Sequence, residues 1–186
     1  MQGLDCGQLL LVKQTSGAEG QLVCCEKGAD GLWTQVLTAP VYIGKNGVSD
    51  HHVEGDMASP LGLYPLGTAF STEETVPFAY PCRTIGPRSW WVDDAESPLY
   101  NQWVEADGKD GFSSGEKMDQ MPVHYHYGLV VEYNTDPITP GRGSAIFIHC
   151  KGDLPYTHGC VAMGEAVMLK VLGWLDAKQH PQVLIH

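Results

Sequence analysis

A histidine and a cysteine preceded by glycine form the part of this sequence best suited to chemistry. His149 closes an apolar run at residues 143–149, and Thr157-His158-Gly159-Cys160 follows after a short loop. A free thiol has a pKa of about 8.5, so it needs a neighbouring base to act as a nucleophile at neutral pH. The order of strand, loop and cysteine would let His149 reach the thiol across the loop. The spacing therefore predicts Cys160 as a nucleophile and His149 as its general base.

The glycine indicates a reaction at a carbonyl group. Because Gly159 lacks a Cβ, the backbone here can come close to a substrate carbonyl. The amides of His158, Gly159 and Cys160 could then form an oxyanion hole for a tetrahedral intermediate. The apolar residues 165–177 predict a helix that begins soon after the cysteine. The unpaired N–H groups at its start would stabilise a thiolate.

Two other interpretations of these residues are a metal site and a structural core. The zinc-binding residue types here are His124, His126, His149, Cys150, His158 and Cys160. Neighbouring residues of a strand point to opposite faces, which separates His149 from Cys150, and the spacing matches no zinc motif. Taken singly, a buried thiol or a satisfied histidine is the ordinary interpretation. The combination of strand-end histidine, loop, His-Gly-Cys and helix favours catalysis, with no metal and no cofactor.

The elements that must position these residues are mainly strands. Runs rich in apolar and β-branched residues predict strands at 7–12, 21–26, 32–37, 41–44, 127–133, 143–149 and 182–186. The segment 165–177 is apolar almost all round, which predicts a buried helix. The sequence thus indicates a mainly β fold with a buried helix near the C-terminal end.

Length and local composition predict a single domain over residues 1–186 with a loop-rich insertion at about 71–126. The insertion is expected to have little regular structure and could act as a lid. Alternation along a strand predicts that one of Cys24 and Cys25 is buried and the other is not. His51 and His52 are expected to face solvent.

The charge balance excludes some classes of partner. With 11 Lys and Arg against 22 Asp and Glu, the formal net charge is −11. Such a surface repels a phosphate backbone, so nucleic-acid binding is not expected. No apolar stretch approaches the length of a membrane span. The first residues, MQGLDCGQLLLVKQ, lack the basic and apolar regions of a signal peptide.

Around the histidine and cysteine the chain resembles the YkuD-type L,D-transpeptidases. The family signature is a strand-end His, a loop, then Ser/Thr-His-Gly-Cys and an aliphatic residue, here His149 and Thr157 to Val161. Further segments resemble one branch of that family in the same order, so that the resemblance covers roughly residues 8–186. These segments are VYIGKNGVS, EGDMASPLGLYPLGTAF, WWVDD, SPLYNQWV, YGLVVEYN, GRGSAIFIH and WLDAKQHPQVLI.

The resemblance implies a β-sandwich or barrel catalytic domain with Cys160 as nucleophile and His149 as base. The backbone carbonyl of Cys150 would orient the imidazole. Tyr125 and Tyr127 precede a predicted strand, and one of them is expected to reach the pocket; Thr157 and Tyr127 are the candidates for contact with substrate. Family enzymes attack the bond between diaminopimelate and a terminal D-Ala of a peptidoglycan stem peptide and form a thioester. An amine acceptor then yields a crosslink, whereas water yields carboxypeptidase activity.

Two departures from the family pattern affect the acceptor. Many members carry Arg or Asn two residues after the cysteine, where this chain has Ala162. The loop between His149 and Cys160 is also shorter than in many members, which could admit water and favour hydrolysis. The expected activity is therefore L,D-transpeptidase, with L,D-carboxypeptidase as one alternative and a non-catalytic wall-binding domain as another.

The resemblance also implies partners and a location. The expected partners are peptidoglycan stem peptides, and carbapenem-type inhibitors would acylate the thiolate. The expected location is the cell envelope, periplasmic or wall-associated, with the export signal outside this sequence. Five further cysteines would be unusual in an oxidising compartment unless they were buried.

Overall fold

The computed structural model describes residues 5–186. Residues 1–4, the first of the stretch compared above with a signal peptide, lie outside the described part. The strands are β1 (Gln8–Ser16), β2 (Glu19–Lys27), β3 (Trp33–Tyr42), β4 (Val48–Ser49), β5 (Ser59–Pro60), β6 (Gly62–Ser71), β7 (Cys82–Thr84), β8 (Ser89–Val92), β9 (Trp103–Glu105), β10 (Gly115–Lys117), β11 (Tyr127–Val131), β12 (Phe147–Cys150), β13 (Val161–Met163) and β14 (Gln182–Ile185). The helices are α1 (Glu165–Trp174) and the 3₁₀ turns η1 (Met118–Gln120) and η2 (Ala177–Gln179).

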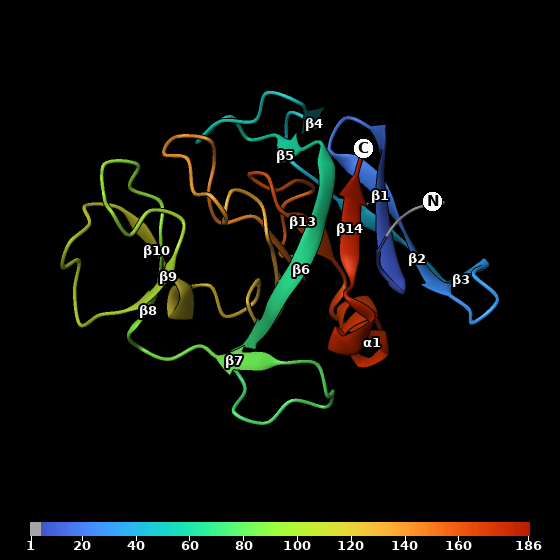
Figure 1. Ribbon diagram of the computed structural model, residues 1–186. Coiled ribbons are helices and arrows are strands. Elements are labelled where there is room, and N and C mark those ends of the chain that lie inside the picture. Colours follow the sequence, from blue (N-terminus) through green and yellow to red (C-terminus); the bar gives the residue numbers. More distant parts are fainter. Residues whose placement is uncertain (1–4) are drawn as a thin grey trace.

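The main sheet closes on itself as a barrel (Figure 1). Its strand order is β11-β12-β13-β3-β2-β1-β14-β6, and β6 pairs again with β11, so that only β7 lies outside the ring. Most pairs are antiparallel, but β12 and β13 run parallel, with His149 opposite Ala162. The loop that joins two parallel strands must return along the barrel, and here that loop carries the Thr-His-Gly-Cys motif. The mainly β prediction is confirmed.

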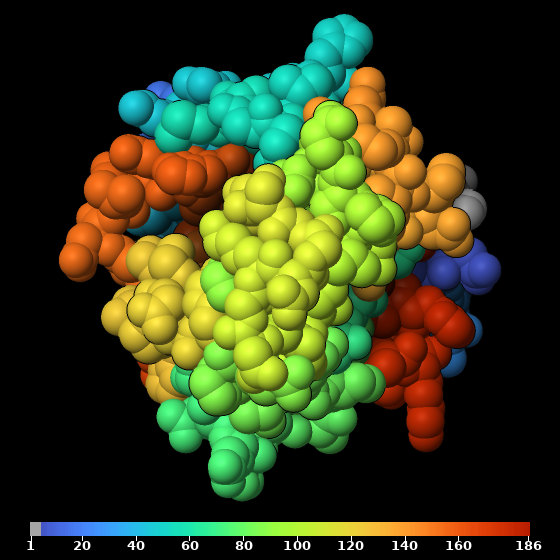
Figure 2. Space-filling view, turned by 90° about the vertical axis from the view of Figure 1, so that its left-hand side faces the viewer, coloured from blue at the N-terminus to red at the C-terminus, as the bar shows by residue number. Residues whose placement is uncertain are grey.

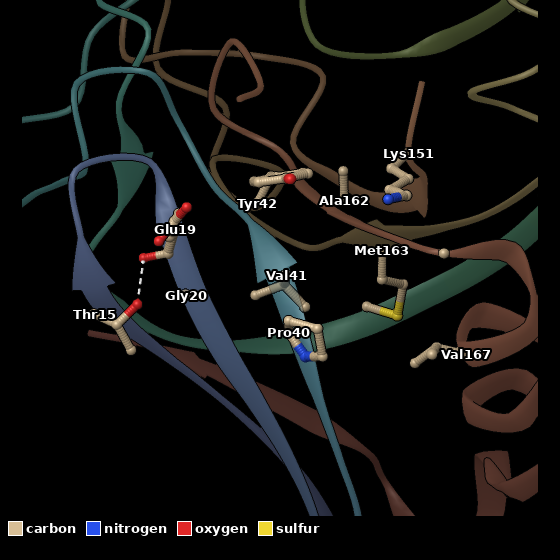
Figure 3. A pocket seen from close by; sticks show the side chains of 11 residues that line it. Thr15, Glu19, Gly20, Pro40, Val41, Tyr42, Lys151, Ala162, Met163 and Val167 are labelled. Atoms are coloured by element: carbon tan, nitrogen blue, oxygen red, sulfur yellow. Dashed lines mark hydrogen bonds between the residues drawn. The ribbon is translucent and has the colours of Figure 1, made fainter. Parts of the chain in front are cut away.

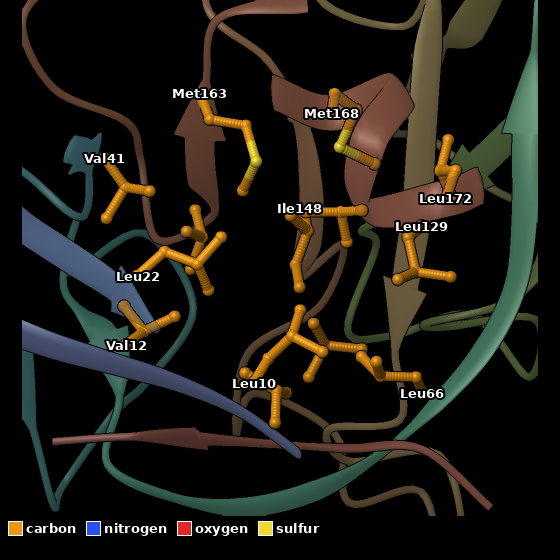
Figure 4. Close-up of a cluster of buried hydrophobic side chains, with 14 of the residues drawn as sticks. Leu10, Val12, Leu22, Val41, Leu66, Leu129, Ile148, Met163, Met168 and Leu172 are labelled. Carbon is orange, nitrogen blue, oxygen red and sulfur yellow. The ribbon is translucent and has the colours of Figure 1, made fainter. Parts of the chain in front are cut away.

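A large apolar core fills the barrel and extends under α1 (Figure 4). Leu10, Leu22 and Ile148 contribute fully buried side chains from three different strands. Met168 and Leu172 of α1 are also fully buried and cover one end of this core. The helix was expected to be buried, and it is buried along this one face; Glu165, Ala166, Lys170 and Gly173 are exposed.

The insertion is more regular than expected. Strands β8, β9 and β10 form a separate three-stranded antiparallel sheet in the order β10-β8-β9. Figure 1 shows this sheet beside the barrel, and Figure 2 shows the insertion, in green and yellow, covering the middle of one face. Trp91 of β8 packs against Phe147 of β12, with ring centroids 4.8 Å apart. A second, smaller core therefore joins the insertion to the strand that carries His149.

Cys24 and Cys25 do not alternate as predicted. Both are buried, with exposed fractions of 0% and 5%. The pairing of β2 with β3 shifts register between these two residues, which indicates a β-bulge. The bulge breaks the strict alternation of faces, and this explains why the prediction failed.

No helix within residues 5–186 is long and apolar enough to cross a membrane.

Candidate active site

Cys160 and His149 line the same cavity. The cavity has a volume of about 200 Å³ and lies between the turn at 121–126 and the loop at 151–158. These two segments, golden and orange, flank a hollow at the left of Figure 2. The lining residues are Glu116, Met121, His124, Tyr125, His149, Gly152, Leu154, Tyr156, Thr157, His158, Cys160 and Ala162.

The tautomer of His149 follows from the hydrogen bond between its ring and the Cys150 carbonyl. Its Nδ1 lies 2.8 Å from the carbonyl oxygen of Cys150. A carbonyl oxygen only accepts, so Nδ1 must carry the proton and Nε2 must hold a free lone pair. Cys150 itself points the other way, into the main core. The contact that the resemblance implied between the imidazole and this carbonyl is present, and Nε2 is left free to take a proton.

The Cys160 thiol is held by backbone groups. Its Sγ donates to the carbonyl oxygen of Ala145 at 3.2 Å and accepts from the amide of Phe147 at 3.3 Å. Within the part of the chain that the structure describes, no hydrogen bond joins Sγ to His149. The thiol must therefore turn from the Ala145 carbonyl before it can give its proton to the imidazole.

Burial makes both members of the pair neutral. Desolvation lowers the pKa of His149 to about 4, and nearby His124 adds to the shift. Desolvation raises the pKa of Cys160 to about 12; the carboxyl of Glu116 adds to this, and the Phe147 amide opposes it. At neutral pH the resting pair is a thiol and an uncharged imidazole rather than an ion pair.

The prediction that the start of the helix stabilises a thiolate on Cys160 is wrong. Cys160 leads directly into β13 (Val161–Met163), and α1 begins only at Glu165, after that strand. The free N–H groups at a helix start act within the first turn, so α1 does not supply a field at the thiol. This is why burial prevails and the thiol pKa is raised.

The loop before the cysteine is fixed by two hydroxyl groups. The Thr157 hydroxyl donates to the carbonyl oxygen of Cys160 at 2.6 Å and accepts from the amide of Gly159 at 3.1 Å. The Ser59 hydroxyl donates to the carbonyl oxygen of Gly159 at 2.6 Å. The Gly159 amide, expected in the oxyanion hole, is thus engaged inside its own loop. The amides of His158 and Cys160 remain candidates for that role.

Two other predictions about side chains need correction. Tyr127 packs in the main core near Phe78 and does not line the cavity, because its strand faces it into the barrel. Of the two tyrosines, one of which was expected to reach the pocket, Tyr125 is the one that lines the cavity. His51 is exposed as expected, but His52 is buried, and its Nδ1 lies 2.8 Å from Asp56 Oδ1.

Sequence reasoning missed Glu116 and Ser59. Glu116 lies on β10 of the insertion sheet and reaches the cavity only through the packing of that sheet on the barrel. Ser59 lies on β5, about a hundred residues before the loop that it holds. Neither residue stands near the motif in the chain, so only the tertiary structure reveals them.

A second hollow, of about 430 Å³, shares Ala162 with the cavity of Cys160 and His149 (Figure 3). Tyr42, Lys151 and Met163 line it, and the Lys151 ammonium lies 5.9 Å from the centre of the Tyr42 ring. Ala162 is the position at which the resembled family often has Arg or Asn. Its single methyl group places no charge between the two hollows.

The sequence matches a family profile over most of its length. The profile of the L,D-transpeptidase catalytic domain, YkuD, matches residues 15–185. No curated protein matches the chain significantly.

One solved structure gives a further comparison of the fold. The helical cell shape determining protein Pgp2 from Campylobacter jejuni is similar with a TM-score of 0.51 and 17% sequence identity. The similarity covers 97% of this chain and 47% of that protein, so this chain spans about half of its length. At this identity the similarity concerns the fold.

Proposed function

Because the chain belongs to the YkuD family of L,D-transpeptidase catalytic domains, we propose that it is an L,D-transpeptidase that forms a thioester on Cys160. The observation that supports this most directly is the shared cavity of Cys160 and His149, with Nδ1 of the histidine bound to the Cys150 carbonyl. The proposed substrates are the stem peptides of peptidoglycan in the cell envelope.

The first half of the reaction begins when substrate displaces the thiol from the Ala145 carbonyl. The S–H proton passes to Nε2 of His149, and Sγ attacks the carbonyl carbon of the diaminopimelate residue. The amides of His158 and Cys160 would stabilise the oxyanion. When the C–N bond breaks, the His149 imidazolium returns the proton to the amine of the leaving D-Ala. The products are free D-Ala and a thioester on Cys160.

The neutral resting pair suits this order of events. A thiol with a raised pKa stays protonated until substrate and base are both in place, so it does not react with other electrophiles beforehand. An imidazole with a lowered pKa is uncharged at neutral pH and ready to accept the proton. The same ring can then act as the acid for the leaving group.

Mass spectrometry after exposure to a carbapenem tests the nucleophile. We expect one adduct, on Cys160, that is absent in Cys160→Ser and strongly slowed in His149→Ala. Cys82→Ser is the matched control, since Cys82 is a partly exposed cysteine that does not line the cavity. An adduct on another cysteine, or none on folded protein whose Cys160 reacts with a thiol reagent, would overturn the proposal.

Hydrolysis of the thioester is the second candidate activity. The loop at 151–158 that borders the cavity is largely exposed, with Leu154 at 53% and His158 also exposed, so water can approach from this side. Incubation of a tetrapeptide stem with and without an amine acceptor separates the two activities. Crosslinked product would support the transpeptidase, whereas tripeptide alone would support an L,D-carboxypeptidase. Binding of stems without D-Ala release would instead indicate a wall-binding domain.

A further inference from the structure

A glutamate from the insertion sheet stands in the catalytic cavity beside the nucleophile. Glu116 lines the cavity together with Cys160 and His149, and its charge acts on the thiol. The hydroxyl of Tyr125 donates to Oε2 of Glu116 and fixes the carboxyl group. Within residues 5–186, the hydrogen bond of the Glu116 side chain is this one, through Oε2. One oxygen is held by the protein, and the other is available to a ligand.

The surroundings of Glu116 supply no positive charge. The residues that line the cavity include no Lys or Arg, and Glu116 has no ion-pair partner among the described residues. The carboxylates of Asp93 and Glu54 are near enough to oppose its ionisation. A carboxylate removed from water is costly unless a cation or donor compensates it. A ligand that brings a cation into the cavity would therefore stabilise the ionised form of Glu116.

A carboxylate at this position helps to keep the resting thiol protonated. Its charge raises the pKa of the Cys160 thiol and disfavours the thiolate. The step that brings a cation into the cavity is the second half, in which an amine, protonated in solution at neutral pH, attacks the thioester.

We infer that Glu116 is the residue that receives the acceptor amine, binding it as an ammonium ion and taking one proton from it. This inference rests on the proposed thioester on Cys160. Oε1 forms the ion pair with the ammonium group while Tyr125 holds Oε2. Transfer of one N–H proton to Oε1 leaves a neutral amine next to the thioester carbonyl.

The remaining bonds and protons balance. The amine nitrogen attacks the carbonyl carbon, a C–N bond forms, and the C–S bond breaks with its electron pair going to Sγ. His149 takes the second N–H proton and passes it to Sγ, which restores the thiol. Glu116 releases its proton to water. The sum is thioester plus ammonium giving amide, thiol and one proton.

The electrostatics of Glu116 are suited to this exchange. Burial, Asp93 and Glu54 raise its pKa to about 7, while the Tyr125 hydroxyl opposes the shift. A group with this pKa can take up and release a proton near neutral pH. The other titratable groups that face the cavity are Tyr125, Tyr156, Cys160, His124, His149 and His158.

Competition between two acceptors tests the role of Glu116. The full chain is supplied with a tetrapeptide stem, n-propylamine and hydroxylamine near neutral pH, and the products are quantified by mass spectrometry. Propylamine is an ammonium ion under these conditions, whereas hydroxylamine is uncharged. In Glu116→Gln we expect the ratio of propylamide to hydroxamate to fall about 100-fold. Tyr125→Phe should lower the propylamide by a smaller factor.

A matched variant separates charge recognition from general effects. Glu105→Gln makes the same isosteric change on β9, where the carboxylate pairs with Arg83 at 2.8 Å outside the cavity, and should leave both products unchanged. Equal loss of propylamide and hydroxamate in Glu116→Gln, or loss of neither, would overturn the role of Glu116 and leave the proposed function standing. Failure of the wild-type protein to form any acyl-enzyme would overturn the proposed function and this inference together.

Discussion

The raised pKa of the Cys160 thiol predicts its reactivity in the free protein. Below its pKa, the thiolate fraction of a cysteine rises about tenfold for each pH unit. Labelling of Cys160 by iodoacetamide, followed by peptide mass spectrometry, should therefore increase about tenfold per unit from pH 7 to 9 without a plateau. The same cysteine in urea-unfolded protein should level off near the ordinary pKa of about 8.5. A plateau below pH 7 in the folded protein would instead indicate a preformed ion pair.

The backbone at Gly159 gives a second prediction for a single residue. Its φ of +143° is a conformation that residues with a Cβ rarely adopt, and an added Cβ would lie 2.9 Å from the Ala58 carbonyl oxygen. Gly159→Ala should lower the free energy of unfolding by about 1–3 kcal/mol and slow carbapenem acylation. Gly108→Ala is the control, because that position is open and lacks a positive φ. Equal urea midpoints for the two variants would contradict the argument.

At the scale of elements, a histidine connects the turn before β11 to the start of α1. His126 Nδ1 lies 2.9 Å from Glu165 and its Nε2 lies 3.3 Å from Glu73. Hydrogen bonding to Glu165 is the main cause that raises the pKa of His126. The cavity wall at 121–126 is thereby tied to the helix that covers the core.

This connection should weaken as pH rises. A histidine with a raised folded-state pKa stabilises the fold fully below its unfolded pKa of about 6.5, and this contribution is lost as pH rises through the folded value. Urea unfolding should find Glu165→Gln less stable than wild type by about 0.5–1 kcal/mol at pH 6, and nearly equal to it at pH 9. The half-exposed position of Glu165 keeps this effect small. Asp50→Asn, which removes the carboxylate beside the exposed His51, is the control and should change the free energy of unfolding equally at both pH values. A difference between Glu165→Gln and wild type that is the same at pH 6 and pH 9 would refute the pairing.

The elements with long apolar runs could be predicted from sequence, and the short ones could not. The runs near β11, β12, β14 and α1 are long enough for their periodicity to identify them. Residues 32–37 and 41–44 were predicted as two strands, but they form β3, which passes through Pro40. Proline is tolerated there because β3 pairs with β13 only at Tyr42. The N–H that Pro40 lacks would therefore have no strand to donate to on that side. Strands β8–β10 have three or four residues each, too few to produce a pattern.

The same distinction applies to the site. Cys160 and His149 could be predicted because one loop between adjacent strands joins them. Glu116 comes from another sheet, and Ser59 from a two-residue strand, so no local spacing connects either to the cysteine. The resting partners of the thiol, Ala145 and Phe147, depend on backbone geometry that side-chain types do not encode.

At the scale of the whole molecule, closure of the barrel depends on β14. This strand lies between β1, to which it is parallel, and β6, to which it is antiparallel, with Leu184 opposite both Leu11 and Leu63. It thus joins the first strand of the chain to the half of the barrel that pairs with β11. His149 lies on β12, which is adjacent to β11, so its position depends on an intact ring.

A proline in β14 should therefore open the barrel and abolish the site with it. Leu184 is only half-buried, so Leu184→Pro mainly removes an amide from a strand with neighbours on both sides. We expect a loss of about 3 kcal/mol or more in the free energy of unfolding, measured by urea denaturation, and loss of carbapenem acylation under the same conditions. Val36→Pro is the control: Val36 is exposed and lies in the bulge of β3, where no pairing with β2 is lost. If both substitutions lowered the free energy of unfolding by the same small amount, the dependence of the barrel on β14 would be refuted. The barrel would then tolerate a broken pairing at β14, and β11 and β13 alone would position His149.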